Sequence, residues 1–157
     1  MLAEVSEGFV ANEATPCGYE FRHLPRKCRR GGGVVIILKT SLKPKLSQVK
    51  VFKSFEYMHL SVRAVNKVLQ VIVVYRPPPL KNNKLTSNGW FGEFTTLLEH
   101  FTPNQGCSEL LITGDFNFHI DDKNDLISKS LQILHSFDLT QHVDIYSYTQ
   151  EIVTPLT

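Results

Sequence analysis

The sequence predicts a layered α/β fold within a single domain. Apolar runs with strand periodicity fill the first half of the chain, and two helical patterns follow, separated by a further short strand. Strands first, with helices inserted later between strands, fit a layered arrangement better than a regular strand–helix–strand repeat. The length of 157 residues is enough for one domain with a proper core and not for two.

Five segments before the triple proline have the pattern of β-strands. Gly18–Leu24 alternates aromatic and polar residues, as a half-buried strand does, and Val34–Leu38 has the composition of a fully buried strand. Val49–Phe52 and Tyr57–Val62 form a second pair of candidates. Leu69–Tyr75 is the strongest candidate, and we expect it to end before the prolines because proline cannot donate to a strand ladder.

Two helices are expected in the second half. Ser87 can cap the first, and a proline ends it. Its apolar residues recur at helical spacing and are Trp90, Phe91, Phe94, Leu97, Leu98 and Phe101. Leu110–Thr113 then forms a short buried strand, and Asn124 or Asp125 can cap the second helix. The apolar side of that helix consists of Ile127, Leu131, Leu134 and Phe137. No further element is expected after Leu139.

Composition and charge limit the classes of function. Hydrophobic residues make up 42% and charged residues 20% of the chain, the balance of a folded protein. A net charge of +2 gives no strong argument for a nucleic-acid partner, but one short stretch is basic and contains Arg22, Arg26, Lys27, Arg29 and Arg30. The three cysteines lack metal-ligand spacing and predict reduced thiols in an intracellular protein. The sequence shows neither a signal peptide nor an apolar run that could span a membrane.

The strongest chemical signal is Gly114-Asp115-Phe116-Asn117, which directly follows a buried strand. In an extended chain Asp115 and Asn117 would point to one side and Phe116 to the other, into the core. A carboxylate beside an amide at the rim of a sheet can orient a water and hold a phosphate oxygen. Taken alone, the tetrapeptide fits a polar turn better than a site.

The surrounding segments reverse that preference, because their order resembles the endonuclease domain of non-LTR (LINE-type) retrotransposons. The segments are RGGGV at 30–34, FEYMHLSV at 55–62, VIVVYRPP at 71–78, LLITGDFNFH at 110–119 and SYT at 147–149. The parent group is the endonuclease/exonuclease/phosphatase superfamily. The similarity extends from about Thr15 to about Thr149. It implies a DNase I-like fold, a layered β-sandwich flanked by helices, with residues 1–157 forming one partial domain that is incomplete at both ends.

The resemblance also implies roles for individual residues. Asp115 matches the aspartate that polarises the attacking water, Asn117 the asparagine that positions the scissile phosphate, and Tyr75 the tyrosine that contacts the phosphate. Thr149 matches a threonine near the same phosphate. The implied reaction is attack of water on a DNA phosphodiester with magnesium as cofactor. A nuclear role follows only from this resemblance.

Two expected features of the family are missing. The family begins with strands that carry an asparagine and the metal-binding glutamate, and it ends with an aspartate and a Ser-Asp-His motif that supplies the general base. Neither pattern is recognisable here, so the chain contributes no metal ligand that we can name. Because loss of such groups costs orders of magnitude in rate, we expect little or no nuclease activity.

Other interpretations remain open. The chain can be an inert or merely nucleic-acid-binding remnant, or another phosphoesterase of the superfamily, such as an abasic-site endonuclease, an RNA deadenylase or a lipid phosphodiesterase. Arg29 and Arg30, beside the triple glycine, are candidate contacts to a DNA backbone, and an ordinary solvated loop explains them about as well.

Overall fold

The computed structural model describes residues 15–25, 33–47, 52–64, 67–78, 87–102, 108–117, 125–142 and 150–153. A two-stranded antiparallel sheet consists of β1 (Tyr19–Pro25) and β2 (Gly33–Lys39), and a short 3-10 helix, η1 (Thr40–Leu42), follows it. A second sheet has five strands in the order β3-β4-β5-β6-β7. Its strands are β3 (Lys45–Ser47), β4 (Glu56–Ala64), β5 (Lys67–Tyr75), β6 (Ser108–Asp115) and β7 (Gln150–Val153).

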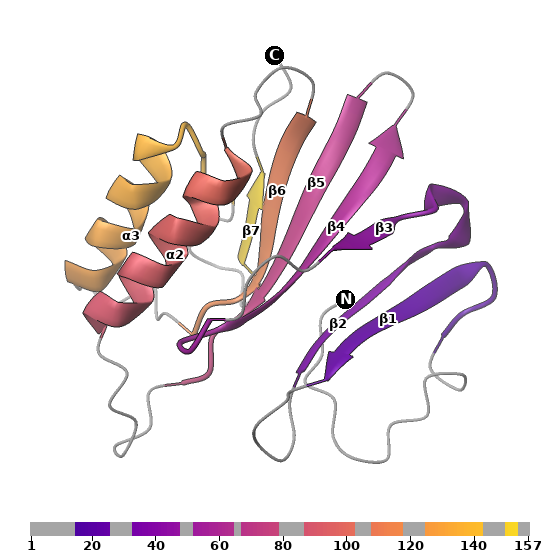
Figure 1. Ribbon diagram of the computed structural model, residues 1–157, viewed down its shortest axis with the longest axis horizontal. Coiled ribbons are helices and arrows are strands. Elements are labelled where there is room, and N and C mark those ends of the chain that lie inside the picture. The colour runs from indigo at the N-terminus through magenta and orange to yellow at the C-terminus, as the bar shows by residue number, and fades with distance from the viewer. Residues whose placement is uncertain are drawn as a thin grey trace.

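The five-stranded sheet is the middle layer of the molecule (Figure 1). Helices α2 (Ser87–Phe101) and α3 (Asp125–Ser136) cover one of its faces, and β1 and β2 lie on the other side. All neighbouring strands of this sheet are antiparallel except β5 and β6, which are parallel. A parallel pair needs a crossover connection, and α2 lies in the connection between these two strands.

Strand β5 contributes to both hydrophobic cores. Ile72 and Val74 pack with the side chains of α2 and α3, whereas Val71 and Val73 pack with β2. Because successive side chains of a strand point to opposite faces, a strand that is covered on both faces is apolar at every position. In β5 this requirement applies to Val71–Tyr75, the apolar run that made it the clearest strand in the sequence, whereas Lys67 is exposed and Gln70 lies at hydrogen-bond distance from His59.

Aromatic side chains of α2 attach this helix to the sheet. The ring centroids of Trp90 and Phe94 lie 4.8 Å apart in a stacked pair. Phe94 meets Phe116, just after β6, edge-on at 6.0 Å. Glu93 of the same helix accepts hydrogen bonds from the Ser54 backbone N–H at 2.9 Å and from the Lys53 N–H at 3.1 Å. The N-terminal half of α2 is therefore bound by hydrogen bonds to the segment that precedes β4 and by aromatic packing to the segment that follows β6.

The main predicted elements are confirmed, with bounds that differ by a few residues. The structure shows a strand at Tyr19–Pro25, a helix that begins at Ser87 and a second helix that begins at Asp125. Three expectations differ. Strand β3 was not predicted, β7 lies where no element was expected, and Phe52 is not part of a strand, while residues 49–51 lie outside the described residues. No helix among the described residues is long and apolar enough to cross a membrane.

Candidate functional site

Tyr75 and Asp115 are neighbours at the ends of parallel strands. The register of β5 and β6 pairs these two residues, and on the other side of β5 the register of β4 pairs Glu56 with Tyr75. Directly paired residues lie on the same face of a sheet. Tyr75 packs against the cluster that β2 shares with the sheet, so the row Glu56–Tyr75–Asp115 lies on the face opposite to the helices. The fold thus brings together two of the predicted site residues that are 40 positions apart in the sequence.

Gly114 allows this close pairing. Its φ of 144° is in the region that disfavours residues with a Cβ atom, and a Cβ atom built there would lie 1.8 Å from the backbone oxygen of Val74. No side chain fits into that space. The glycine of the Gly-Asp-Phe-Asn motif is therefore a packing requirement at the junction of β5 and β6.

Asp115 and Asn117 lie side by side and bind each other. The Asn117 backbone N–H donates to Asp115 Oδ1 at 2.9 Å, and Asn117 Nδ2 donates to Asp115 Oδ2 at 3.1 Å. The extended backbone expected at Asn117 is wrong, because β6 ends at Asp115 and Asn117 has a φ of 48°. Asparagine tolerates this left-handed conformation better than most residues, and the aspartate bond closes a local turn.

The Asn117 side chain makes a second bond that determines what it can offer to a ligand. Nδ2 also donates to the backbone oxygen of Arg76 at 2.6 Å. The two Nδ2 hydrogens of Asn117 are therefore used by Asp115 and Arg76. The remaining polar atom of the amide, Oδ1, is an acceptor. In this arrangement Asn117 presents an oxygen, rather than an N–H, for a further contact.

Arg76 is a component of the site that sequence reasoning missed. Its backbone N–H donates to Asp115 O at 2.8 Å, and its Nη1 donates to the backbone oxygens of Phe116 at 3.2 Å and Asn117 at 3.4 Å. The residue is only 9% exposed, and its guanidinium carbon lies 5.3 Å from the centre of the Trp90 ring. Burial lowers the pKa of the Arg76 guanidinium below its usual value. The sequence signal that could have identified Arg76 is a charged residue directly after a buried strand.

The remaining predicted site residues, Thr149, Arg29 and Arg30, lie outside the described residues. In the part of the chain that the structure describes, no group of three or more histidine, cysteine, aspartate or glutamate side chains could hold a metal ion. Asp115 is of the ligand type that magnesium prefers, but among the described residues it belongs to no such group. The described residues therefore do not form a magnesium site by themselves.

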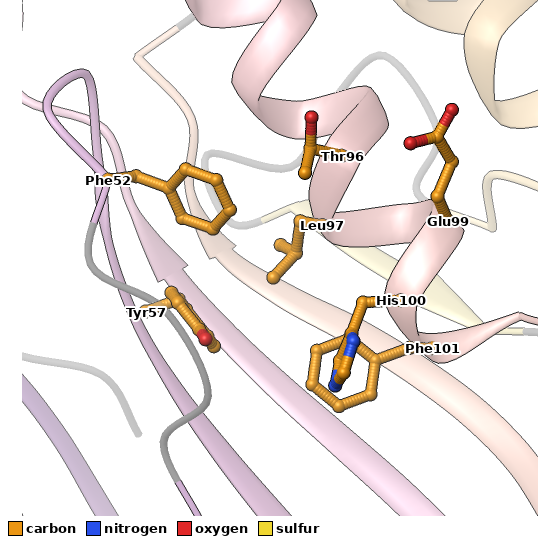
Figure 2. A pocket seen from close by; sticks show the side chains of 7 residues that line it. All are labelled: Phe52, Tyr57, Thr96, Leu97, Glu99, His100 and Phe101. Carbon is orange, nitrogen blue, oxygen red and sulfur yellow. The ribbon is translucent and has the colours of Figure 1, made fainter.

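A cavity of about 280 Å³ lies elsewhere, between β4 and the C-terminal half of α2 (Figure 2). Its lining residues are Phe52, Tyr57, Thr96, Leu97, Glu99, His100 and Phe101. Tyr57 and Leu97 belong to the core on the helix face of the sheet, whereas Tyr75 packs on the opposite face. The cavity is therefore separate from the Asp115–Asn117 site.

Comparison with known proteins identifies the fold. No protein-family model matches this sequence, and no match was found among curated proteins. The structure is similar to the endonuclease domain of TRAS1, a telomere-specific non-LTR retrotransposon, with a TM-score of 0.61 and 10% identity over 98% of this chain and 71% of that one. It is also similar to the human Nocturnin catalytic domain with bound sulfate (TM-score 0.59, 11% identity, 87% of this chain and 60% of that one).

A further similar structure is D. rerio TDP2 complexed with single strand DNA product (TM-score 0.54, 13% identity, 88% of this chain). This chain spans 52% of the TDP2 chain's length, so it matches only part of a solved structure of this fold. At such low identities the similarity establishes architecture alone. The chain has an incomplete DNase I-like fold.

Proposed function

We propose that this chain is part of a DNA phosphodiesterase domain of the type that non-LTR retrotransposons carry. The observation that carries the proposal is the convergence of Tyr75, Asp115 and Asn117 at the ends of β5 and β6. These strand ends are the position at which the sequence resemblance expects the scissile phosphate. The similarity to an endonuclease domain over 98% of the chain supports the same assignment.

In phosphodiester hydrolysis each of the three side chains has a different role. The exposed carboxylate of Asp115 accepts a hydrogen bond from a water and orients it for attack. The hydroxyl of Tyr75, from the neighbouring strand, donates to a phosphate oxygen and stabilises the charge that develops there. Asn117 donates to the phosphate only after one Nδ2 hydrogen leaves Asp115 or Arg76, so substrate binding is expected to rearrange this pair.

Magnesium is the cofactor that the resemblance implies. Because the described residues do not complete a site for it, we assign it no ligands and no step. The proposal expects the chain to bind DNA. Because the described residues do not complete a metal site, it expects the 157-residue chain by itself to cleave DNA only weakly. Arg29, Arg30 and Thr149 remain candidate contacts to the DNA in this proposal, and a nuclear location would follow from action on DNA.

The test is nicking of supercoiled plasmid by the purified chain in magnesium, with EDTA as one control. Asp115→Asn is the informative variant, and Glu99→Gln is its match, because both remove one exposed carboxylate with little change of shape. Nicking that EDTA and Asp115→Asn abolish, while Glu99→Gln retains it, supports catalysis at this site. Nicking that Asp115→Asn leaves unchanged would place the active site elsewhere.

The same preparations separate the alternative, a domain that binds nucleic acid without cleaving it. Fluorescence anisotropy with labelled DNA at two salt concentrations measures binding independently of cleavage. Salt-dependent binding without nicking supports the binding-only alternative, and the absence of both contradicts the proposed function. Parallel assays on RNA and on a lipid phosphodiester distinguish the other phosphoesterases of this fold.

A further inference from the structure

Arg76 is connected to every residue of the Asp115–Asn117 turn. Its backbone N–H and its Nη1 donate to the backbone oxygens of Asp115, Phe116 and Asn117, and its own backbone oxygen accepts from Asn117 Nδ2. One residue at the end of β5 thus contacts both the backbone of the turn and the side chain that the proposed function places at the phosphate.

The guanidinium of Arg76 is also held from the helix side. It lies 5.3 Å from the Trp90 ring centre, and Trp90 stacks on Phe94, which meets Phe116 edge-on. Burying a guanidinium costs solvation energy, which charge-assisted bonds to carbonyl oxygens and the contact with an aromatic face offset. The arginine therefore bridges α2 and the turn that follows β6.

We propose that Arg76 is a positioning residue of the candidate site. It holds Asn117 in the left-handed backbone conformation in which the Asn117 amide bonds to Asp115. Arg76 thereby determines which atoms of that amide can contact a phosphodiester. The inference depends on the proposed function for its substrate, but the coupling of Arg76 to Asn117 is a property of the free protein.

The shape of arginine matters to this role. Its planar group directs several N–H bonds from a rigid fork, so Nη1 reaches the oxygens of two consecutive residues while the flat face lies over Trp90. A lysine carries the same charge but has neither the fork nor the flat face. Arg76→Lys thus keeps the charge and removes the geometry.

The first test is NMR spectroscopy of the ¹⁵N-labelled full chain without DNA. The readouts are the backbone N–H and side-chain NH₂ signals of Asn117 in the wild type, Arg76→Lys and Trp90→Phe, with the exposed Arg63→Lys as matched control. The expected result is that the Asn117 signals move toward those of a solvent-exposed asparagine in Arg76→Lys and move less in Trp90→Phe. Arg63→Lys should leave them in place.

A folded Arg76→Lys protein with unchanged Asn117 signals would overturn the proposal. If Arg76→Lys does not fold, Trp90→Phe decides in the same way, because it removes the indole face against which the guanidinium is held and so weakens the Nη1 bonds to the turn. A purely structural role would shift signals throughout the core without favouring the turn, and that pattern also counts against the proposal.

DNA affinity separates this inference from the proposed function. With labelled DNA, Arg76→Lys is expected to bind about fivefold more weakly than Arg63→Lys, the loss that one hydrogen bond predicts. Shifted Asn117 signals with equal DNA affinities contradict the role in substrate binding. If no variant and not even the wild type binds DNA, the proposed function fails, whereas the NMR result still decides whether Arg76 positions Asn117.

Discussion

A Cβ atom at Gly114 would lie 1.8 Å from the backbone oxygen of Val74, so β5 leaves no room for a side chain at this point of β6. Gly114→Ala must therefore push the two strands apart or abandon the φ of 144°. We predict that this substitution lowers the free energy of unfolding by about 3 kcal/mol or more, from steric overlap and backbone strain together. Urea denaturation followed by circular dichroism measures the loss.

Gly92 provides the control for this prediction. It is an exposed residue of α2, and nothing lies within 4 Å of the position that its Cβ atom would take. Gly92→Ala should stabilise the protein by about 0.5–1 kcal/mol, because alanine is the better helix former. Equal effects of the two Gly→Ala substitutions would show that the overlap at Gly114 is relieved by a small shift.

Glu93 is predicted to contribute to stability through the segment before β4. Its carboxylate accepts from the Lys53 and Ser54 backbone N–H groups and from the Ser54 hydroxyl, and Ser54 is buried. Glu93→Ala leaves these donors without their acceptor and should cost about 1–3 kcal/mol in thermal or urea unfolding. Glu99→Ala, on the exposed side of the same helix, should cost less than about 0.5 kcal/mol. Similar losses in both variants would refute the specific role of Glu93.

His59 predicts a dependence of stability on pH. His59 is 7% exposed, its Nε2 lies 2.6 Å from Gln70 Oε1, and its ring centroid lies 4.4 Å from that of Phe101. Burial, the largest cause, lowers the pKa of His59 below 6.5; the bond to Gln70 opposes the shift, and the electrostatic interaction with His100 adds to it. Among the described residues its Nδ1 has no hydrogen-bond partner, so the neutral ring is the form that the fold accommodates.

The sign of the effect follows from proton binding. Between the lowered pKa in the folded chain and 6.5, the unfolded chain binds more protons at His59, so stability falls as the pH falls below 6.5. One such group gives a slope of at most about 1.4 kcal/mol per pH unit. Urea unfolding between pH 5 and 8 should show this slope, and His59→Phe should reduce it, whereas exchange of the exposed His135 for glutamine should not. An unchanged slope in His59→Phe would assign the pH dependence to other groups.

The sequence predicted those elements whose own residues carry the pattern. The apolar run of β5 and the helical spacing from Trp90 to Phe101 are local signals, so both elements were identified. Strands β3 and β7 have three and four residues without a period, and they form through backbone bonds to β4 and β6. Such pairing depends on the tertiary structure, so a short segment has no sequence pattern from which it can be predicted.

The candidate site shows the same division. Asp115 and Asn117 were singled out because they follow a buried strand, but their proximity to Tyr75 depends on a parallel pairing across 40 residues, which only the family resemblance anticipated. Arg76 was missed because an arginine between a strand and prolines is usually solvent-exposed. Its burial depends on Trp90 and on the carbonyl oxygens of the turn after β6, none of which is adjacent in sequence.

Two substitutions of Asn117 separate the effect of its backbone conformation from the effect of its side-chain amide. Asn117→Gly and Asn117→Ala both remove the amide that donates to Asp115 and Arg76, but only alanine is strained at a φ of 48°. The alanine variant should therefore be less stable than the glycine variant by about 1 kcal/mol in urea unfolding. If the amide meets the phosphodiester as proposed, both variants should lose DNA affinity or nicking equally. If Asn117→Gly retains DNA binding or nicking, the substrate contacts the backbone of the turn and does not need the Asn117 side chain.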